Sequence, residues 1–267
     1  MPTWEARVSG ATAPADRVDA EVRYAFAAPL LRDAALWIDL GCGTGVAAGA
    51  ALAGGAVARA VLVDRSAEAL AQARRECGAE VIAAVEADLE TAEGIAAVRA
   101  AIAEARGGDG ATVVTCFDVL HQLTDFTALV ELLLALGAEG ATVVLSVPDD
   151  AAGALDDPHR ATAWSAGAAE ELRRLMPEGA VVARQVPVRA AAIVVDGESA
   201  PLGTVSISAD QSAAHHLLAF GPDVARLTPV SHAHAAPLDD ERADARRRES
   251  DLAYLEARVA QLEGPGA

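Results

Sequence analysis

The chain has 267 residues, 52% of them hydrophobic and 22% charged, which is enough for one large folded domain or two small ones. Because 39 Asp and Glu face 21 cations, all of them Arg, the net charge of −18 and the 3% aromatic content disfavour nucleic acid or an anionic membrane as a partner. The absence of Lys also excludes Schiff-base enzymes, kinases and the usual phosphate-binding P-loop, since each requires a Lys amine.

The first predicted element is a helix over Asp16–Arg32 that ends near Pro29. The sequence before it is acidic and lacks the apolar stretch of a signal peptide, and no apolar run approaches the ~20 residues that cross a bilayer. The three cysteines form no C-x-x-C pair and do not indicate a disulfide framework. We therefore expect a cytoplasmic protein in which residues 1–33 form a helical cap, lying over a sheet edge or over a ligand cleft.

Between Ala34 and Val147, short apolar runs alternate regularly with helical stretches. The predicted strands are Leu36–Leu40, Ala60–Asp64, Val81–Val85, Thr112–Phe117 and Thr142–Val147. The predicted helices between them are Val46–Leu52, Ala67–Cys77, Ala92–Arg106 and Phe126–Leu136. Strands that are apolar throughout and alternate with helices indicate a doubly wound α/β fold, with a mostly parallel sheet covered on both faces.

After the fifth strand the pattern changes. Ser165–Met176 is predicted to form a helix that is stopped by Pro177 and Gly179. Four apolar runs follow, separated by Gly, Pro and Asp: Val181–Val186, Ala191–Val195, Thr204–Ser208 and His216–Phe220. These runs suit antiparallel strands that close the sheet, and which of them are separate strands stays open. The main domain would then span residues 34–228.

Residues 229–267 form a charged linker followed by a helical pattern. The apolar residues of this helix stand at the a and d positions of a coiled coil: Leu252, Leu255, Val259 and Leu262. Only about two heptads are visible, so a homodimer through this helix and a helix docked on its own domain are equally compatible with the sequence.

A Gly-rich turn follows the first predicted strand, in the run WIDLGCGTG that ends at Gly45. Its glycines would let the backbone turn tightly and approach a ligand, at the sheet edge where such folds bind cofactors. A dinucleotide fingerprint would place Gly at position 46, where this chain has Val. Asp39 at the mouth of the loop would repel a pyrophosphate and attract a cationic ligand. The turn therefore predicts a cationic cofactor.

This turn resembles the first motif of the class I S-adenosylmethionine-dependent methyltransferases, an acidic residue followed by x-G-x-G-x-G. The resemblance covers about Leu36 to Val147. It implies a Rossmann-like, mostly parallel seven-stranded sheet with helices on both faces and a C-terminal helix. It also implies S-adenosylmethionine as the cofactor, with S-adenosylhomocysteine as its product. The residues that it assigns to the cofactor in this motif are Asp39, Gly41, Cys42, Gly43 and Gly45.

Two further acidic positions match the family. Asp64 ends the second strand, where a carboxylate can accept both ribose hydroxyls, and Arg65 follows it. The NAD-binding folds share this feature, and Ser66 is better explained as the N-cap of the next helix. After the third strand, Asp88 resembles the family's adenine-edge acid, with Leu89 packing on the ring. A solvated turn residue is the other interpretation of Asp88.

The segment after the fourth strand, CFDVLHQL, resembles the part of many small-molecule methyltransferases that borders the methionine end of the cofactor and the substrate. The resemblance makes Asp118 a candidate for cofactor or substrate contact. His121 has two interpretations: a general base that takes a proton from an acceptor hydroxyl, or a structural histidine that bonds a loop carbonyl. Both stay open at this point.

The segment from Pro148 to Trp164 would help to set the identity of the acceptor. Its acids and His159 could bind a divalent ion or form a solvated loop, and we favour the loop because adjacent carboxylates are expected in such an acidic chain. His215 and His216 would point to opposite faces of a strand, and no Cys/His set has zinc-site spacing. No metal is therefore expected.

The resemblance implies an S-adenosylmethionine-dependent methyltransferase acting on a small molecule, most simply on a hydroxyl of a sugar or secondary metabolite. The N/D-P-P-Y/F segment that amino and amide methyltransferases commonly carry after the fourth strand is replaced here by Asp118-Val-Leu-His. The alternatives are a methyltransferase-like module that binds without turnover and, with less support, an NAD-linked oxidoreductase.

Overall fold

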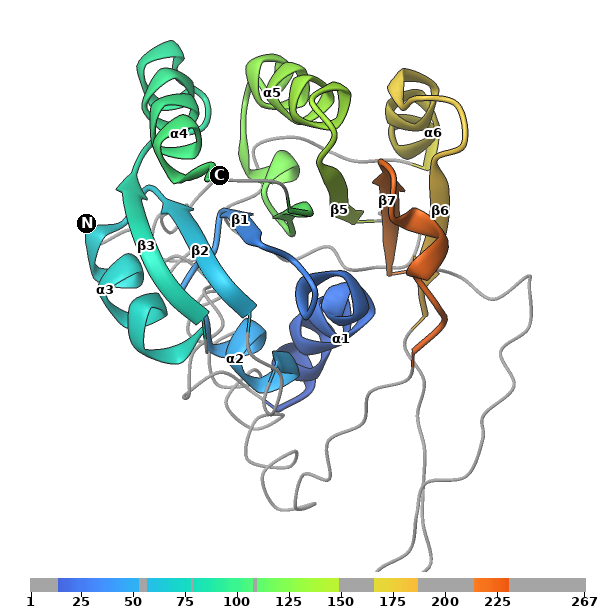
Figure 1. The fold of residues 1–267 in the computed structure, drawn as a ribbon. Helices are drawn as coiled ribbons and strands as arrows, with labels where there is room; N and C mark the ends of the chain where they lie inside the picture. Colours follow the sequence, from blue (N-terminus) through green and yellow to red (C-terminus); the bar gives the residue numbers. More distant parts are fainter. Residues whose placement is uncertain are drawn as a thin grey trace, which may run out of the picture.

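The computed structural model describes residues 14–52, 57–77, 79–107, 110–148, 166–186 and 214–230. Its centre is a seven-stranded sheet in the order β3-β2-β1-β4-β5-β7-β6 (Figure 1). The strands are β1 (Leu36–Leu40), β2 (Val57–Asp64), β3 (Ala79–Glu86), β4 (Thr112–Cys116), β5 (Thr142–Pro148), β6 (Val181–Gln185) and β7 (His215–Phe220). The α-helices are α1 (Pro14–Leu31), α2 (Val46–Leu52), α3 (Ala67–Glu76), α4 (Ala92–Ala105), α5 (Thr127–Ala138) and α6 (Ala166–Leu175), with short 3-10 turns η1 (Leu120–Gln122) and η3 (Val224–Arg226).

The predicted mostly parallel sheet of seven strands is confirmed, and so is the antiparallel pairing of the strands that close it. The pairs from β3 across to β5 are parallel, and β7 is antiparallel to both β5 and β6. Strand β6 therefore runs in the same direction as the first five strands, and β7 alone is reversed among the strands that the structure describes. The predicted runs at 191–195 and 204–208 and the predicted C-terminal helix lie outside the described residues.

The five parallel strands and the four helices between them form where the alternating pattern placed them. Strand β2 is the main difference, because it begins at Val57 rather than at Ala60. Its pairing with β3 shifts register between these two residues, so the additional residues pair less regularly than the core of the strand. This irregular start explains why the apolar run marks only the second part of β2.

Both faces of the sheet are covered, and each carries its own hydrophobic core (Figure 1). Helices α4, α5 and α6 lie on one face, and α1, α2 and α3 lie on the other. Along β1, Leu36, Ile38 and Leu40 pack into the first core, whereas Trp37 packs into the second. Because successive side chains of a strand point to opposite faces, a strand buried on both sides reads as one continuous apolar run.

Helix α1 continues through Pro29 to Leu31 instead of ending at the proline. Leu30 and Leu31 are completely buried, so packing against the sheet holds the last turn in place despite the hydrogen bond that a proline removes. The side chain of Arg226 also donates to the carbonyl of Pro29 at 2.6 Å and pairs with Asp33. Among the described residues, no helix is both long and apolar enough to cross a membrane.

Candidate functional site

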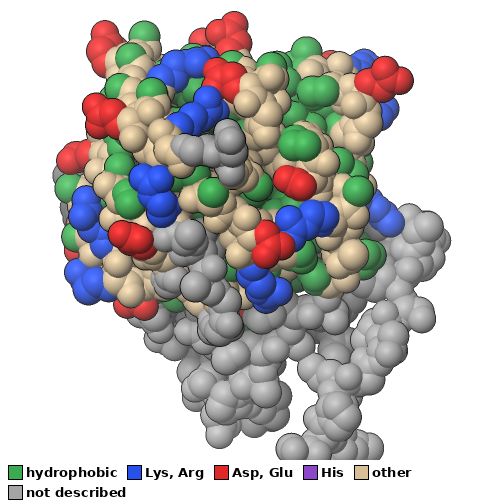
Figure 2. All heavy atoms as spheres, in the orientation of Figure 1, with side chains coloured by type: hydrophobic (Ala, Val, Ile, Leu, Met, Phe, Trp, Pro, Cys, Tyr) green, Lys and Arg blue, Asp and Glu red, His purple; other side chains and the backbone are tan. Residues whose placement is uncertain are grey.

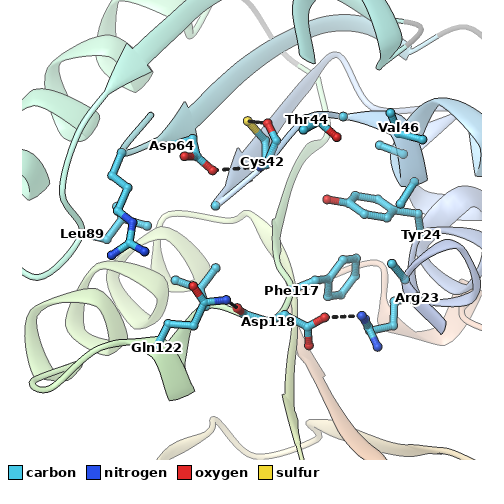
Figure 3. Close-up of a pocket in the computed structure, with 18 of the residues that line it drawn as sticks. Arg23, Tyr24, Cys42, Thr44, Val46, Asp64, Leu89, Phe117, Asp118 and Gln122 are labelled. Carbon is cyan, nitrogen blue, oxygen red and sulfur yellow. Dashed lines mark hydrogen bonds and ion pairs between the residues drawn. The ribbon is translucent and has the colours of Figure 1, made fainter. Parts of the chain in front are cut away.

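A pocket opens at the carboxyl ends of β1, β2, β3 and β4, beside α1 (Figure 3). The wall of this pocket includes every predicted site residue except Asp39 and His121, namely Gly41, Cys42, Gly43, Gly45, Asp64, Arg65, Asp88, Leu89 and Asp118. Residues far apart in the sequence therefore meet at one edge of the sheet, which is where open α/β folds bind their ligands. Their contact with a cofactor stays a prediction.

The three glycines of the turn have positive φ angles, and each has a different steric surrounding. A Cβ on Gly41 would lie 2.2 Å from Val119 Cγ2, and one on Gly45 would lie 2.8 Å from Ala73 Cα in α3. A Cβ on Gly43 would meet nothing within 4 Å. Gly41 and Gly45 are thus required by close packing, whereas the space beside Gly43 belongs to the pocket.

Asp64 fixes the glycine turn to the end of β2. Its Oδ2 accepts a hydrogen bond from Gly43 N at 2.9 Å, and its Oδ1 accepts one from Ser66 N at 2.9 Å. Ser66 has the predicted N-cap role, because its side chain accepts from Ala69 N at the start of α3. The carboxylate therefore stands in the pocket wall with a fixed orientation, so it is preorganised for the ribose contact that the sequence predicts.

The end of the pocket opposite α1 lies at the turn after β3. Asp88 is exposed, and its Oδ1 accepts from Glu90 N at 3.0 Å, as expected for a turn residue. Leu89 is buried and offers an apolar surface to the pocket beside it. This end can therefore hold a flat apolar ring that carries a polar edge.

Asp39 does not stand at the mouth of the glycine turn, which corrects the sequence prediction. It is 1% exposed, lies outside the pocket wall, and accepts hydrogen bonds from Tyr24 Oη at 2.9 Å and Thr115 Oγ1 at 2.6 Å. Burial raises the pKa of Asp39 to about 7, although the hydrogen bonds from Thr115 and Tyr24 lower it. Two donors thus compensate the buried carboxylate, and a contact of Asp39 with the cofactor stays a prediction.

Asp118 connects the pocket to α1, β5 and β7. It pairs with Arg23 from α1, receives a hydrogen bond from Ser146 Oγ at 3.3 Å and lies 3.2 Å from His215 Nε2. Burial alone would raise the pKa of Asp118, but Arg23, His215 and His121 hold it well below the usual range. Asp118 is therefore a carboxylate that stays ionised while it lines the pocket.

The backbone of Asp118 is also unusual, because its φ of 57° is the one positive value among the described non-glycine residues. Such a conformation costs roughly 1–3 kcal/mol and persists only where the surroundings impose it. Here the Asp118 N–H donates to Ser146 Oγ at 3.0 Å, and Gln122 Nε2 donates to the Asp118 carbonyl at 2.6 Å. The strain aims the side chain of Asp118 at Arg23 and the pocket.

His121 does not line the pocket either. It lies in the 3-10 turn η1 and is 5% exposed. Such burial is compatible with a structural histidine, and His121 also lies close enough to the pocket residue Asp118 to lower its pKa. Both interpretations of His121 therefore stay predictions.

Several residues that the sequence analysis did not assign to the site also line the pocket, among them Arg23, Tyr24, Phe117 and Gln122. Phe117 and Gln122 lie in the segment CFDVLHQL, which the resemblance placed at the methionine end of the cofactor. Arg23 and Tyr24 come from α1, and Figure 3 shows the Tyr24 and Phe117 rings opposite Asp64 and Leu89. Only the expectation that the cap could lie over a ligand cleft pointed toward α1. The rarity of aromatic residues is a second signal. The chain has just two Tyr and four Phe, and one residue of each type lines the pocket.

The pocket fits the groups of S-adenosylmethionine in two respects. The open space beside Gly43 allows a ligand to approach the backbone more closely than any side chain would permit. At the Tyr24 end, Arg23 is 4% exposed and its Nε has no hydrogen-bond partner within the described part of the chain. A buried donor of this kind suits the carboxylate of the methionine moiety.

Three solved structures that are similar to this chain are between 14% and 18% identical to it. The methyltransferase domain of bacterial CtHen1 is 14% identical, covering 77% of this chain and 97% of that chain with a TM-score of 0.48. A DUF574 family protein from Streptomyces avermitilis is 18% identical, covering 78% and 83% with a TM-score of 0.48. The magnesium protoporphyrin IX methyltransferase of Synechocystis PCC 6803, solved with S-adenosylhomocysteine, is 16% identical, covering 77% and 82% with a TM-score of 0.42.

No curated protein matches this chain. A family model described as "Methyltransferase domain" matches residues 15–182, which is more than half of the chain and includes the N-terminal cap helix, the glycine turn and all five parallel strands. The chain therefore belongs to the S-adenosylmethionine-dependent methyltransferase domain family.

Proposed function

We propose that this methyltransferase transfers the methyl group to a hydroxyl oxygen of a small molecule such as a sugar or a secondary metabolite. The observation that carries the proposal is Asp118, an ionised and partly exposed carboxylate in the wall of the cofactor pocket. Ionised carboxylates accept strong hydrogen bonds from hydroxyl groups. A hydroxyl acceptor would therefore find a fixed partner at this end of the pocket.

The residues of the pocket suggest how each part of the cofactor would be held. Asp64 would accept the ribose hydroxyls, and Asp88 with Leu89 would hold the adenine. Arg23 would donate from its buried Nε to the methionine carboxylate. Bound S-adenosylmethionine supplies a methyl group on a sulfonium, which is already a good leaving group, so the protein needs no nucleophile of its own.

Under this proposal, the chain contributes position and exclusion of water. Helix α1 lies along the pocket and is attached to the sheet through Arg23, which bonds Gln185 on β6 at 2.9 Å and pairs with Asp118. A covered site keeps the acceptor in line with the methyl group and limits hydrolysis. Asp118 would orient the acceptor hydroxyl. Because its pKa is low, Asp118 is a weak base, so the hydroxyl proton would pass to solvent as the bond from oxygen to the methyl carbon forms and the bond from carbon to sulfur breaks.

The charge of the protein supports a small acceptor rather than a nucleic acid. The chain carries a net charge of −18, and among the described residues on the face drawn in Figure 2 acidic and arginine side chains are interspersed rather than gathered into a basic stripe. Nucleic acids bind to surfaces on which positive charge is concentrated. A small neutral molecule does not need a positively charged surface, and the negative net charge does not repel it.

A labelled-methyl transfer assay against sugars, phenols, amines and carboxylic acids tests the proposal. We expect label on hydroxyl oxygens, and label confined to nitrogen or carboxylate oxygen would refute it. Asp118→Asn should lower kcat/KM for the hydroxyl acceptor by about tenfold or more, the loss of one charge-assisted hydrogen bond, while leaving the S-adenosylmethionine Kd within about threefold. Glu139→Gln, which removes an exposed carboxylate paired with Arg106, is the matched control and should leave both values unchanged.

A further inference from the structure

We propose that Tyr24 and Phe117 form a subsite for the sulfonium group of S-adenosylmethionine, and that the buried Asp39 positions the Tyr24 ring. This subsite would bind the charged methyl donor more tightly than the neutral product. The inference rests on the assignment of the pocket to the cofactor and does not depend on which acceptor is methylated.

The two rings lie together in the pocket wall. Their centroids are 5.0 Å apart and their planes meet at 88°, an edge-to-face arrangement (Figure 3). Tyr24 also meets Trp37 edge to face, with centroids 6.3 Å apart. In a chain that is 3% aromatic, three rings thus gather at one place, and two of them line the pocket.

The position of the rings along the pocket indicates which part of the cofactor they would meet. The ribose acid Asp64 and the adenine pair Asp88 and Leu89 lie at the ends of β2 and β3. Tyr24 and Phe117 lie across the glycine turn from them, beside α1 and the end of β4. An extended cofactor with its adenosine at the first end therefore presents its sulfonium to the rings.

A buried chain of hydrogen bonds holds the Tyr24 ring in place. Trp37 Nε1 donates to Thr115 Oγ1 at 2.7 Å, Thr115 donates to Asp39 at 2.6 Å, and Tyr24 Oη donates to the other Asp39 oxygen at 2.9 Å. Burial, then Asp39 and Cys42, raise the pKa of Tyr24 well above its ordinary value, so the ring carries a neutral hydroxyl. The tyrosine hydroxyl is engaged by Asp39, while the residue also lines the pocket.

The local charges favour a cation at this place. The nearby guanidinium of Arg23 is paired with Asp118 and bonded to Gln185, so it is largely neutralised. The face of an aromatic ring attracts a cation electrostatically, more strongly where water is excluded. A hydroxyl that donates to a carboxylate also makes its ring more electron-rich, which strengthens this attraction.

The subsite predicts a property that simple packing would not produce. S-Adenosylmethionine and S-adenosylhomocysteine share the adenosine and the amino acid, and they differ in the methyl group and the positive charge. An apolar contact with the rings would serve both ligands almost equally. A ring-to-sulfonium attraction would favour the donor and speed the release of the product.

The test is calorimetric titration, without acceptor, of S-adenosylmethionine, S-adenosylhomocysteine and sinefungin, in which a protonated amine replaces the sulfonium methyl. For Tyr24→Leu we expect the affinity for the two cations to fall about tenfold and that for S-adenosylhomocysteine by no more than about twofold. Tyr24→Phe keeps the ring but removes its hydrogen bond to Asp39, so the donor-to-product ratio should fall by about threefold, less than in Tyr24→Leu. A ratio equal to that of wild type in Tyr24→Phe would refute the positioning role of Asp39. A Tyr24→Leu protein whose ratio equals that of wild type would overturn the proposal.

Two further variants make the outcome decisive. Phe117→Leu removes the second ring without touching the hydrogen bonds of Asp39, and it becomes the deciding variant if Tyr24→Leu does not fold. Phe126→Leu, at the start of α5 and packed against the other core, is the matched control and should not change the ratio.

Wild-type protein that binds none of the three ligands would instead refute the cofactor assignment. Binding with the expected ratio but no hydroxyl methylation would refute only the proposed acceptor.

Discussion

Gly43→Ala tests the pocket assignment most directly, because the structure separates its effect on binding from its effect on folding. The φ of Gly43 is 54°, and a Cβ there would meet nothing within 4 Å. The only cost to folding is therefore that of placing alanine in the left-handed conformation, roughly 1–2 kcal/mol. The lower conformational entropy of the unfolded alanine variant partly offsets this cost. In a chain of this size the net effect is about 2–4 °C in the thermal midpoint.

The added methyl group would stand in the pocket, where the cofactor should approach the backbone. We expect the S-adenosylmethionine Kd to rise at least about tenfold, the consequence of displacing a ligand from a close backbone contact. Gly179→Ala is the matched control, because Gly179 has a φ of 86°, open space around its Cβ position and no place in the pocket. Its thermal midpoint should fall equally while its Kd stays at the wild-type value. Titration calorimetry and thermal unfolding measure both quantities, and equal Kd values for the two variants would refute the site.

Three other predictions follow from buried groups. Gly45→Ala should lower the thermal midpoint further than Gly43→Ala, because its Cβ would lie 2.8 Å from Ala73 Cα in α3; equal midpoints would show that α3 moves aside without cost. Burial raises the pKa of Asp39 to about 7 from an ordinary 3.8, so between these pH values the folded state holds a proton that the unfolded state has released. Wild-type protein should therefore lose up to roughly 4 kcal/mol relative to Asp39→Asn as the pH rises from 4 to 7, and parallel denaturation curves at both pH values would contradict this. His121→Ala should reduce stability and leave kcat per folded molecule unchanged, whereas a loss of kcat at unchanged stability would support the general-base role.

The parts of the fold that the sequence predicted are those set by local patterns. Strand β1 reads as an apolar run because both of its faces are buried, and the glycine turn after it is visible because Gly41, Gly43 and Gly45 all have positive φ angles. The direction of β6 was not predictable, since an apolar run has the same appearance whichever way the strand points. Its direction depends on pairing with β7, which comes later in the chain.

The position of Asp39 shows a second limit. In a strand that is apolar on both faces, alternation does not reveal which neighbours a polar residue will meet. Asp39 points to the face of Trp37 and α1, where Tyr24 and Thr115 donate to it across separations of 15 and 76 residues. The acid of the motif was therefore visible in the sequence, but the partners that decide its role come from α1 and β4.

Helix α1 contributed most of what the sequence could not predict about the site. Arg23 reaches Asp118 across 95 residues and Gln185 across 162, so its contacts depend on how the whole domain closes. Gln185 in turn donates to the Asp19 carbonyl at 3.1 Å, so the same residue of β6 anchors helix α1 at a second point along the helix. Only the docked helix turns the edge of the sheet into a walled pocket.

The pairing of Arg23 with Asp118 also bears on the kind of acceptor that the pocket can receive. An anionic acceptor beside Asp118 would be repelled, because that carboxylate stays ionised. Attraction to Arg23 would compensate this repulsion only weakly, because Arg23 is already paired with Asp118 and bonded to Gln185. An amine would be held in its ammonium form by the ionised Asp118, and an ammonium nitrogen has no lone pair to attack the methyl group. A neutral hydroxyl meets neither penalty and can still donate to the carboxylate, so the balance of charge at this end of the pocket favours the same acceptor class as the hydrogen-bonding groups do.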